Sequence, residues 1–288
     1  MPLFTGLYIN LDRSADRRRA IEDKFARIGL GGIYARLAAS EGNALDVPNP
    51  HGLKTGEIGC FISHYRALDQ NRATSTPLHV VEDDIILSPQ LPQVLDWAIS
   101  AGHLDKYDLL FTDVAVPLLN DACHAYKAFY DAIVKRDAAG NITDTAFAVL
   151  DMRELIFASA SSYLVKPASI GKLAGLLHKE LMAGAAMPVD LHVRKLCQQG
   201  VIRVGCIFPF VTTVDIDTSL STMTEKRFDD LPAMAANILR RSFFIGADWG
   251  QLCAEAGRLL PQPDAGDAHR QLMMRLLGYA LTPGYKKC

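Results

Sequence analysis

The chain has 288 residues, of which 49% are hydrophobic and 22% are charged, and its formal net charge is −2. This length suits one large domain or one domain with an appendage, and the apolar share excludes a disordered chain. The near-neutral charge excludes a general attraction to nucleic acid, so an anionic ligand would have to be met by a local basic patch.

Cysteine usage and hydropathy bear on the compartment. Six cysteines are widely scattered and form no CxxC motif: Cys60, Cys123, Cys197, Cys206, Cys253 and Cys288. This distribution is typical of reduced thiols rather than of a disulfide framework. No basic segment precedes the short apolar run at the N-terminus, and no apolar stretch is long enough to span a bilayer. We therefore expect a soluble cytoplasmic protein.

The first ninety residues alternate between strand and helix patterns. Apolar runs predict strands over residues 6–11, 33–39 and 78–81. Apolar residues at helical spacing predict a helix capped by Ser14 and a second over residues 55–71, capped by Thr55. This order is typical of an α/β fold with a mainly parallel sheet and right-handed crossovers.

The remaining elements are predicted by the same criteria. Strands are expected over residues 107–114, 159–167 and 202–214, and helices over residues 168–184 and 187–200. Residues 115–155 are interpreted as a partly helical excursion, and residues 231–244, 247–260 and 268–281 as three C-terminal helices.

Three consecutive acids, Glu82, Asp83 and Asp84, interrupt the apolar stretch LHVVEDDIIL at residues 78–87. They stand where a strand ends, and ligands of open α/β sheets bind beyond the carboxyl ends of the strands. If the chain stays extended, Glu82 and Asp84 face one side and Asp83 the other. Two close carboxylates repel each other unless one is protonated or a cation lies between them, and oxygen ligands suit Mg²⁺ or Mn²⁺. Solvated acids or a helix cap are the structural alternative.

A basic cluster lies at the start of the first predicted helix and consists of Arg13, Arg17, Arg18 and Arg19. Arginines beside helix N-terminal amides suit a diphosphate. The alternative is a solvated basic face, to which Arg18 and Arg19 are assigned. A diphosphate that is held by arginines and bridged to carboxylates by a divalent ion is typical of a nucleotide-sugar site.

Several motifs in fixed order resemble glycosyltransferase family 25, the lipopolysaccharide-biosynthesis glycosyltransferases. They are LYINLDRSADRRRAI, LAASEG, GEIGCFISHYRAL and HVVEDDIIL, followed by ASSYLVKPASIGKL and MPVDLHV. The resemblance covers roughly residues 5–220. It implies a GT-A-like, Rossmann-related fold and inverting transfer of galactose or glucose from a UDP-sugar.

The resemblance also implies roles for individual residues. The acids match the family's acidic motif, with Asp84 as a metal ligand, Glu82 at the metal or the donor ribose, and Asp83 beside the donor. Asn10 and Arg13 match the first motif and are expected to line the nucleotide.

Two further positions carry open alternatives. Asp190 is the candidate general base or a ligand of the acceptor hydroxyl, and an N-cap of its helix is the alternative. Glu57 and His64, seven residues apart on one helix, either reach the donor or buttress the acids. A hydrogen-bonded histidine packed against the sheet is the default for His64.

The predicted organisation is a GT-A-like domain over residues 1–225, with a donor half at about 1–115 and an acceptor half at about 116–225. Residues 226–288 form a helical extension that packs on this domain, pairs with a second subunit, or lies peripherally at the inner face of the plasma membrane.

The predicted function is transfer of a hexose from a UDP-sugar to a saccharide or lipid-linked saccharide, with Mn²⁺ or Mg²⁺ as cofactor. A nucleotidyltransferase is one alternative, although no glycine-rich loop follows the first strand. A degenerate, non-catalytic binding subunit is the other.

Overall fold

The computed structural model describes residues 2–42, 47–116, 127, 134–136, 142–145, 147–214 and 231–258. The described strands are β1 Thr5–Asn10, β2 Tyr34–Ala38, β3 Leu78–Glu82, β4 Ile85–Leu87, β5 Leu109–Phe111, β6 Val134–Arg136, β7 Ile142–Thr145, β8 Ala148–Asp151, β9 Ser162–Val165, β10 Val204–Phe208 and β11 Thr212–Val214. The described α-helices are α1 Ala15–Arg27, α2 Thr55–Asp69, α3 Leu91–Ser100, α5 Pro167–Met182, α6 Val189–Gln198, α7 Leu231–Ser242 and α8 Trp249–Arg258.

The central sheet has seven strands in the order β2-β1-β3-β9-β5-β10-β8. Strands β2, β1, β3, β5 and β10 run in one direction, while β9 and β8 run in the other. The predicted α/β class is therefore confirmed, with a mixed and largely parallel sheet.

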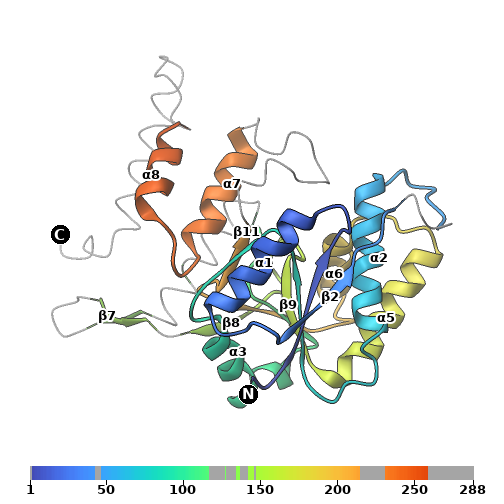
Figure 1. The fold of residues 1–288 in the computed structure, drawn as a ribbon, viewed down its shortest axis with the longest axis horizontal. Helices are drawn as coiled ribbons and strands as arrows, with labels where there is room; N and C mark the ends of the chain where they lie inside the picture. The colour runs from blue at the N-terminus through green and yellow to red at the C-terminus, as the bar shows by residue number, and fades with distance from the viewer. Residues whose placement is uncertain are drawn as a thin grey trace.

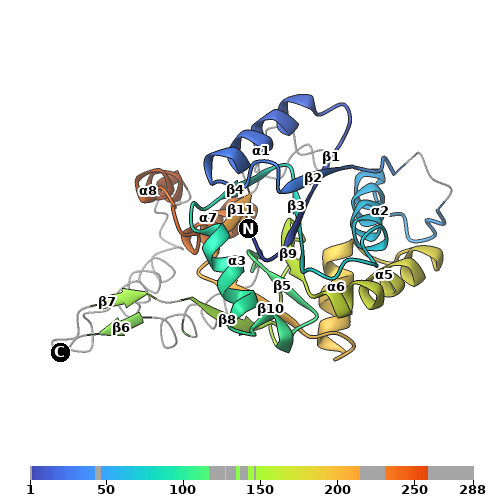
Figure 2. The same ribbon diagram turned by 60° about the horizontal axis from the view of Figure 1, so that its bottom comes forward.

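Helices cover both faces of this sheet (Figures 1 and 2). Helices α2, α5 and α6 lie on one face, and α1 and α3 on the other. Strand β1 shows how the sequence directs the two layers, because its side chains alternate between them. Leu7 and Ile9 pack with the α2 side, whereas Tyr8 packs with Ile21 and Phe25 of α1.

The register of the parallel strands brings the carboxyl ends of β1, β2 and β3 to one edge. Asn10 of β1 is paired with Ala38 of β2, and Ile9 of β1 with Glu82 of β3. The acids that follow β3 and the residues that follow β1 therefore share one rim, as the sequence predicted.

Two local expectations need correction. Thr55 does not cap α2; it is the helix's first residue, and Lys54 is the cap. Much of residues 115–155, expected to be a partly helical excursion, lies outside the described residues; the described ones include strands β6, β7 and β8 and a helical residue, Lys127. The strand expected over residues 202–214 is split into β10 and β11, which belong to different sheets, because Pro209 has no N–H to continue the pairing.

The C-terminal helices α7 and α8 confirm two of the three predicted ones, and the third, over residues 268–281, lies outside the described residues. The end of α7 is attached to the sheet edge by backbone hydrogen bonds, from Phe210 to Phe243 and from Ile245 to Phe210. Phe243 and Phe244 are buried there. Among the described residues, no helix is long and apolar enough to cross a membrane.

Candidate active site

The acidic motif follows β3 in a turn, and this turn decides where its side chains lie. Strand β3 ends at Glu82, and the turn at Asp83 and Asp84 leads into β4. Asp83 accepts a hydrogen bond from Asn10 Nδ2 at 2.6 Å and forms an ion pair with Arg17. Arg17 Nη2 also lies 2.9 Å from Asp84 Oδ2. The predicted alternation is thus wrong: Asp83 and Asp84 share Arg17 of α1, whereas Glu82 points to α2.

The negative charges of the acidic turn are only partly offset by the positive charge of Arg17. Burial, the charge of Glu82 and that of Asp83 together raise the pKa of Asp84 to about 6, although Arg17 opposes the rise. Burial also raises the pKa of Asp83, against the influence of Arg17 and Asn10. Within the described part of the chain, Asp84 Oδ1 and Arg17 Nε are buried and have no hydrogen-bond partner. A buried carboxylate oxygen without a partner is costly unless a ligand satisfies it.

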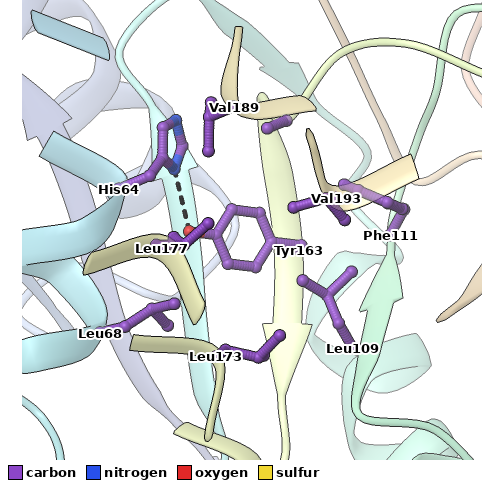
Figure 3. A pocket seen from close by; sticks show the side chains of 10 residues that line it. His64, Leu68, Leu109, Phe111, Tyr163, Leu173, Leu177, Val189 and Val193 are labelled. Carbon is purple, nitrogen blue, oxygen red and sulfur yellow. Dashed lines mark hydrogen bonds between the residues drawn. The ribbon is translucent and has the colours of Figure 1, made fainter. Parts of the chain in front are cut away.

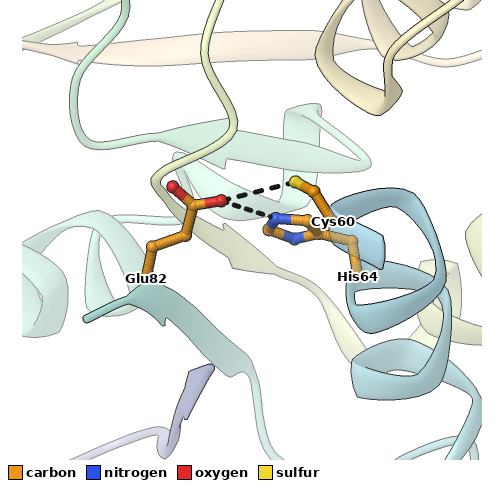
Figure 4. A group of neighbouring side chains, drawn as sticks. All are labelled: Cys60, His64 and Glu82. Carbon is orange, nitrogen blue, oxygen red and sulfur yellow. Dashed lines mark hydrogen bonds and ion pairs between the residues drawn. The ribbon is translucent and has the colours of Figure 1, made fainter. Parts of the chain in front are cut away.

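Glu82 meets two side chains from one face of α2 (Figure 4). Its Oε1 lies 3.3 Å from His64 Nε2 and accepts from Cys60 Sγ at 3.5 Å. Burial alone would raise the pKa of Glu82, but the hydrogen bonds from His64 and Cys60 outweigh it, so the pKa lies below its ordinary value. His64 Nδ1 is in turn 2.9 Å from the hydroxyl of Tyr163. His64 is thus a buried, hydrogen-bonded histidine, as expected by default, and it also contacts the acids through Glu82, which was one of the alternatives left open.

A cleft of about 380 Å³ opens beside the carboxyl ends of β1 and β2. Its lining consists of Leu11, Asp12, Ala38, Ala39, Ser40, Glu41 and Arg66. Arg13 is half exposed and forms an ion pair with Glu41, which brings it to this cleft. Asn10 lies deeper, and both of its amide atoms are engaged: Nδ2 donates to Ser14 O and Asp83, and Oδ1 accepts from Arg36. Asn10 thus positions the acidic turn.

A second, much smaller cavity lies under His64 and is apolar (Figure 3). It measures about 20 Å³ and is lined by the rings of Tyr163 and Phe111 and by aliphatic side chains of β5, α2, α5 and α6. That volume is close to a single water molecule. The cavity is therefore a packing defect beneath the site rather than a place for a sugar.

Asp190 lies inside the first turn of α6, so it is not the helix cap, a position that Pro188 occupies. Its Oδ2 accepts a hydrogen bond from the backbone N–H of Ser159 at 2.7 Å. Ser159 has a positive φ of 82°, a conformation that is uncommon for a residue with a side chain. Burial raises the pKa of the Cys60 thiol, and the charges of Glu82 and Asp190 add to the rise, so Asp190 lies within electrostatic reach of Cys60.

Other predicted residues lie apart from the acidic turn. Glu57 accepts a hydrogen bond from the backbone N–H of Lys54 at 2.9 Å, so its carboxylate caps the N-terminus of α2. Arg18 pairs with Glu22, and Arg19 with Asp16, on the exposed side of α1. These two arginines form the solvated face that was assigned to them.

Sequence reasoning missed a buried ion pair next to the site. Asp113, after β5, is fully buried and accepts from Arg240 Nε of α7 at 2.7 Å. Arg240 Nη2 also donates to the hydroxyls of Ser159 at 3.0 Å and Ser161 at 2.8 Å. Its charge reaches Asp84 and partly opposes the rise in the pKa of that carboxyl group. The string FTD at the end of a buried strand was the one available signal for Asp113, since it repeats the strand-then-acid pattern of the EDD motif.

The fold and the rim site define a class of protein: an α/β enzyme with carboxylates and an arginine at the carboxyl ends of parallel strands. The model of glycosyltransferase family 25 (LPS biosynthesis protein) matches residues 5–193, and the chain belongs to this family. Membership makes it a glycosyltransferase of lipopolysaccharide biosynthesis and displaces the nucleotidyltransferase alternative.

Two further comparisons were made. A solved structure of the galactosyltransferase LgtC in complex with donor and acceptor sugar analogues is similar to this chain at 11% identity, with a TM-score of 0.36, over 90% of this chain and 98% of that one. Among curated proteins, no sequence matches this chain.

Proposed function

We propose that this glycosyltransferase moves a hexose, galactose or glucose, from a UDP-sugar to a saccharide acceptor, with a divalent cation at the acidic turn. The observation that carries the proposal is the unsatisfied Oδ1 of Asp84, buried beside Arg17 and within the electrostatic influence of Glu82. An oxygen donor set of this kind fits Mn²⁺ or Mg²⁺, which keep positions open for phosphate oxygens.

The chain's own residues divide the work of binding the donor. Asp84, together with the oxygen of Glu82 that does not face α2, would hold the cation. Arg17, whose Nε has no partner among the described residues, would reach the diphosphate. The cleft beside β1 and β2 would take the nucleoside, with Arg13 and Glu41 at its mouth. When bound, the divalent ion supplies positive charge that offsets the charge developing on the leaving diphosphate.

Asp190 is assigned as the general base. The hydrogen bond from Ser159 to Oδ2 fixes the orientation of the carboxylate, and Oδ1 would accept the proton of the acceptor hydroxyl as that oxygen attacks the anomeric carbon. A base on the acceptor side of the sugar corresponds to an inverting transfer, which is the stereochemistry we propose.

The proposal is tested by thermal unfolding with UDP, with Mn²⁺, and with both. A ligand at about a hundred times its dissociation constant adds about 2.7 kcal/mol to the stability of the folded state. We expect stabilisation of the wild type that requires both components and is lost in Asp84→Asn. Asp16→Asn, which makes the same change at an exposed acid of α1, is the matched control and should respond like the wild type. Equal responses of Asp84→Asn and wild type would contradict the assignment.

A further inference from the structure

Cys60, His64 and Glu82 form a group whose chemistry differs from that of the acidic turn. Their ligand atoms, Sγ, an imidazole nitrogen and a carboxylate oxygen, all lie within 4.8 Å of one another. A thiolate and an imidazole favour a softer cation such as Zn²⁺, whereas Mg²⁺ and Mn²⁺ favour oxygen.

The spacing of these atoms fits tetrahedral zinc. Ligands bound at about 2.0–2.3 Å to a tetrahedral ion lie about 3.3–3.8 Å from each other. The observed separations from Glu82 Oε1 are 3.3 Å to His64 Nε2 and 3.5 Å to Cys60 Sγ. Figure 4 shows that the sulfur and the ring nitrogen both point toward the same carboxylate oxygen. Only small movements of the three side chains would admit an ion among them.

The backbone and a neighbouring side chain hold this arrangement. Cys60 and His64 are four residues apart on α2, so they stand one turn apart on one helix face. Glu82 ends β3, which fixes its position relative to that helix. Tyr163 contacts His64 Nδ1 at 2.9 Å. A partner on the second ring nitrogen orients a metal-binding histidine and sets which nitrogen is available to the ion.

We propose that Cys60, His64 and Glu82 form a second cation site that binds Zn²⁺ through sulfur, nitrogen and oxygen, with the fourth position open to water or another ligand. The ion would displace the thiol proton of Cys60. This proposal does not depend on the nature of the glycosyl donor, and it concerns a different ion from the one proposed at Asp84.

The test uses Co²⁺ as a spectroscopic substitute for Zn²⁺, added to the full-length, metal-free protein. Cobalt bound by a thiolate gives a charge-transfer absorption band in the near ultraviolet, and Zn²⁺ should remove this band by displacing cobalt at one equivalent per chain. We expect the band in the wild type and its loss in Cys60→Ser. The affinity for Zn²⁺, measured by competition with a chromophoric chelator, should fall by at least about 100-fold in Cys60→Ser and His64→Gln.

Matched controls identify the thiol. Cys253 is exposed on α8 and does not belong to this group, so Cys253→Ser should keep the band. Tyr163→Phe retains all three ligands and should weaken Zn²⁺ binding by about 10-fold or more, as loss of an orienting partner does. If Cys60→Ser does not fold, as judged by circular dichroism without metal, Cys60→Ala takes its place.

Each outcome is decisive for this site. A thiolate band that persists in the Cys60 variant, or its absence from the wild type, would overturn the proposal. Stabilisation by UDP and Mn²⁺, measured on the same Cys60 variant, reports on the acidic turn separately. The two measurements therefore distinguish a failure of the proposed zinc site from a failure of the proposed donor site.

Discussion

Arg240 of α7 and Asp113 after β5 form a buried ion pair between residues that are 127 positions apart in the sequence. Arg240 donates to one carboxylate oxygen, while the hydroxyls of Ser161 and Thr212 donate to the other. Both charged side chains are almost fully removed from solvent. The family match ends at residue 193, so this pair ties a helix beyond the matched region to the carboxyl edge of the sheet.

The first prediction concerns this pair. Arg240→Met should lower the free energy of unfolding by about 3–5 kcal/mol, because it leaves the Asp113 carboxylate buried and unpaired. The double variant Asp113→Leu/Arg240→Met should lose less than Arg240→Met alone, since no uncompensated charge remains. Urea unfolding measures both values.

An exposed ion pair provides the control for the loss of an arginine. Arg72 pairs with Asp69 at the end of α2, where both side chains are more than a third exposed. Arg72→Met should therefore cost no more than about 1 kcal/mol. If Arg240→Met costs no more than this control, the buried pair does not tie α7 to the sheet.

The sequence could predict those features that have a local cause. The alternation of strands and helices follows from periodicity, and the rim position of Glu82, Asp83 and Asp84 follows from an acidic run at the end of an apolar strand. Arg17 could be placed near the acids because it opens a helix that follows a neighbouring strand.

Features decided by tertiary contacts were not predictable in this way. The direction of Glu82 depends on where the strand turns, and no periodicity marks that residue. The reversed directions of β9 and β8 depend on connections that burial patterns do not encode. Arg240 could not be assigned to Asp113, because the sequence of an amphipathic helix does not show whether a basic side chain is solvated or forms a buried ion pair. Nothing in the sequence distinguishes Cys60 from the other five cysteines, because its contact with Glu82 arises only from the packing of α2 against the sheet.

The second prediction compares two helical glycines. A Cβ at Gly59 of α2 would lie 2.4 Å from the carbonyl oxygen of Ser40, which lines the cleft, and 2.9 Å from the nitrogen of Gly42. Both are backbone atoms, so Gly59→Ala must displace the loop and should cost about 1–3 kcal/mol. At Gly175 of α5, no atom beyond the neighbouring residues and backbone of its own helix lies within 4 Å of such a Cβ. Gly175→Ala should therefore stabilise the protein by about 0.5–1 kcal/mol. Thermal unfolding of the two variants checks the opposite signs.

The third prediction concerns pH and His79, which is fully buried between Tyr34 and Ser162. Burial lowers the pKa of His79 from 6.5 to about 3. Between these values the unfolded chain binds a proton that the folded protein does not, so stability is complete above pH 6.5 and falls as the pH decreases. At pH 5 the loss from this residue should be about 2 kcal/mol.

The measurement is the free energy of unfolding of wild type and His79→Gln at pH 7 and pH 5. The variant should lose less stability than the wild type between the two pH values, whatever its stability at pH 7. His178→Gln, which changes an exposed histidine of α5, controls for the removal of an imidazole. Parallel losses in wild type and His79→Gln would contradict a neutral, buried His79.

The last prediction separates the proposed base from the proposed donor site. Asp190→Asn keeps an oxygen that can accept from the N–H of Ser159 but cannot take a proton from the acceptor. Its turnover should therefore fall by about 10²–10⁴-fold. Stabilisation by UDP and Mn²⁺ should be unchanged, because Asp190 is not assigned to either ligand. Release of UDP, with a donor and acceptor that the wild type uses, measures the rate. Wild-type turnover in Asp190→Asn would make this carboxylate a structural support of Ser159, and a simultaneous loss of UDP binding would instead place it in the donor site.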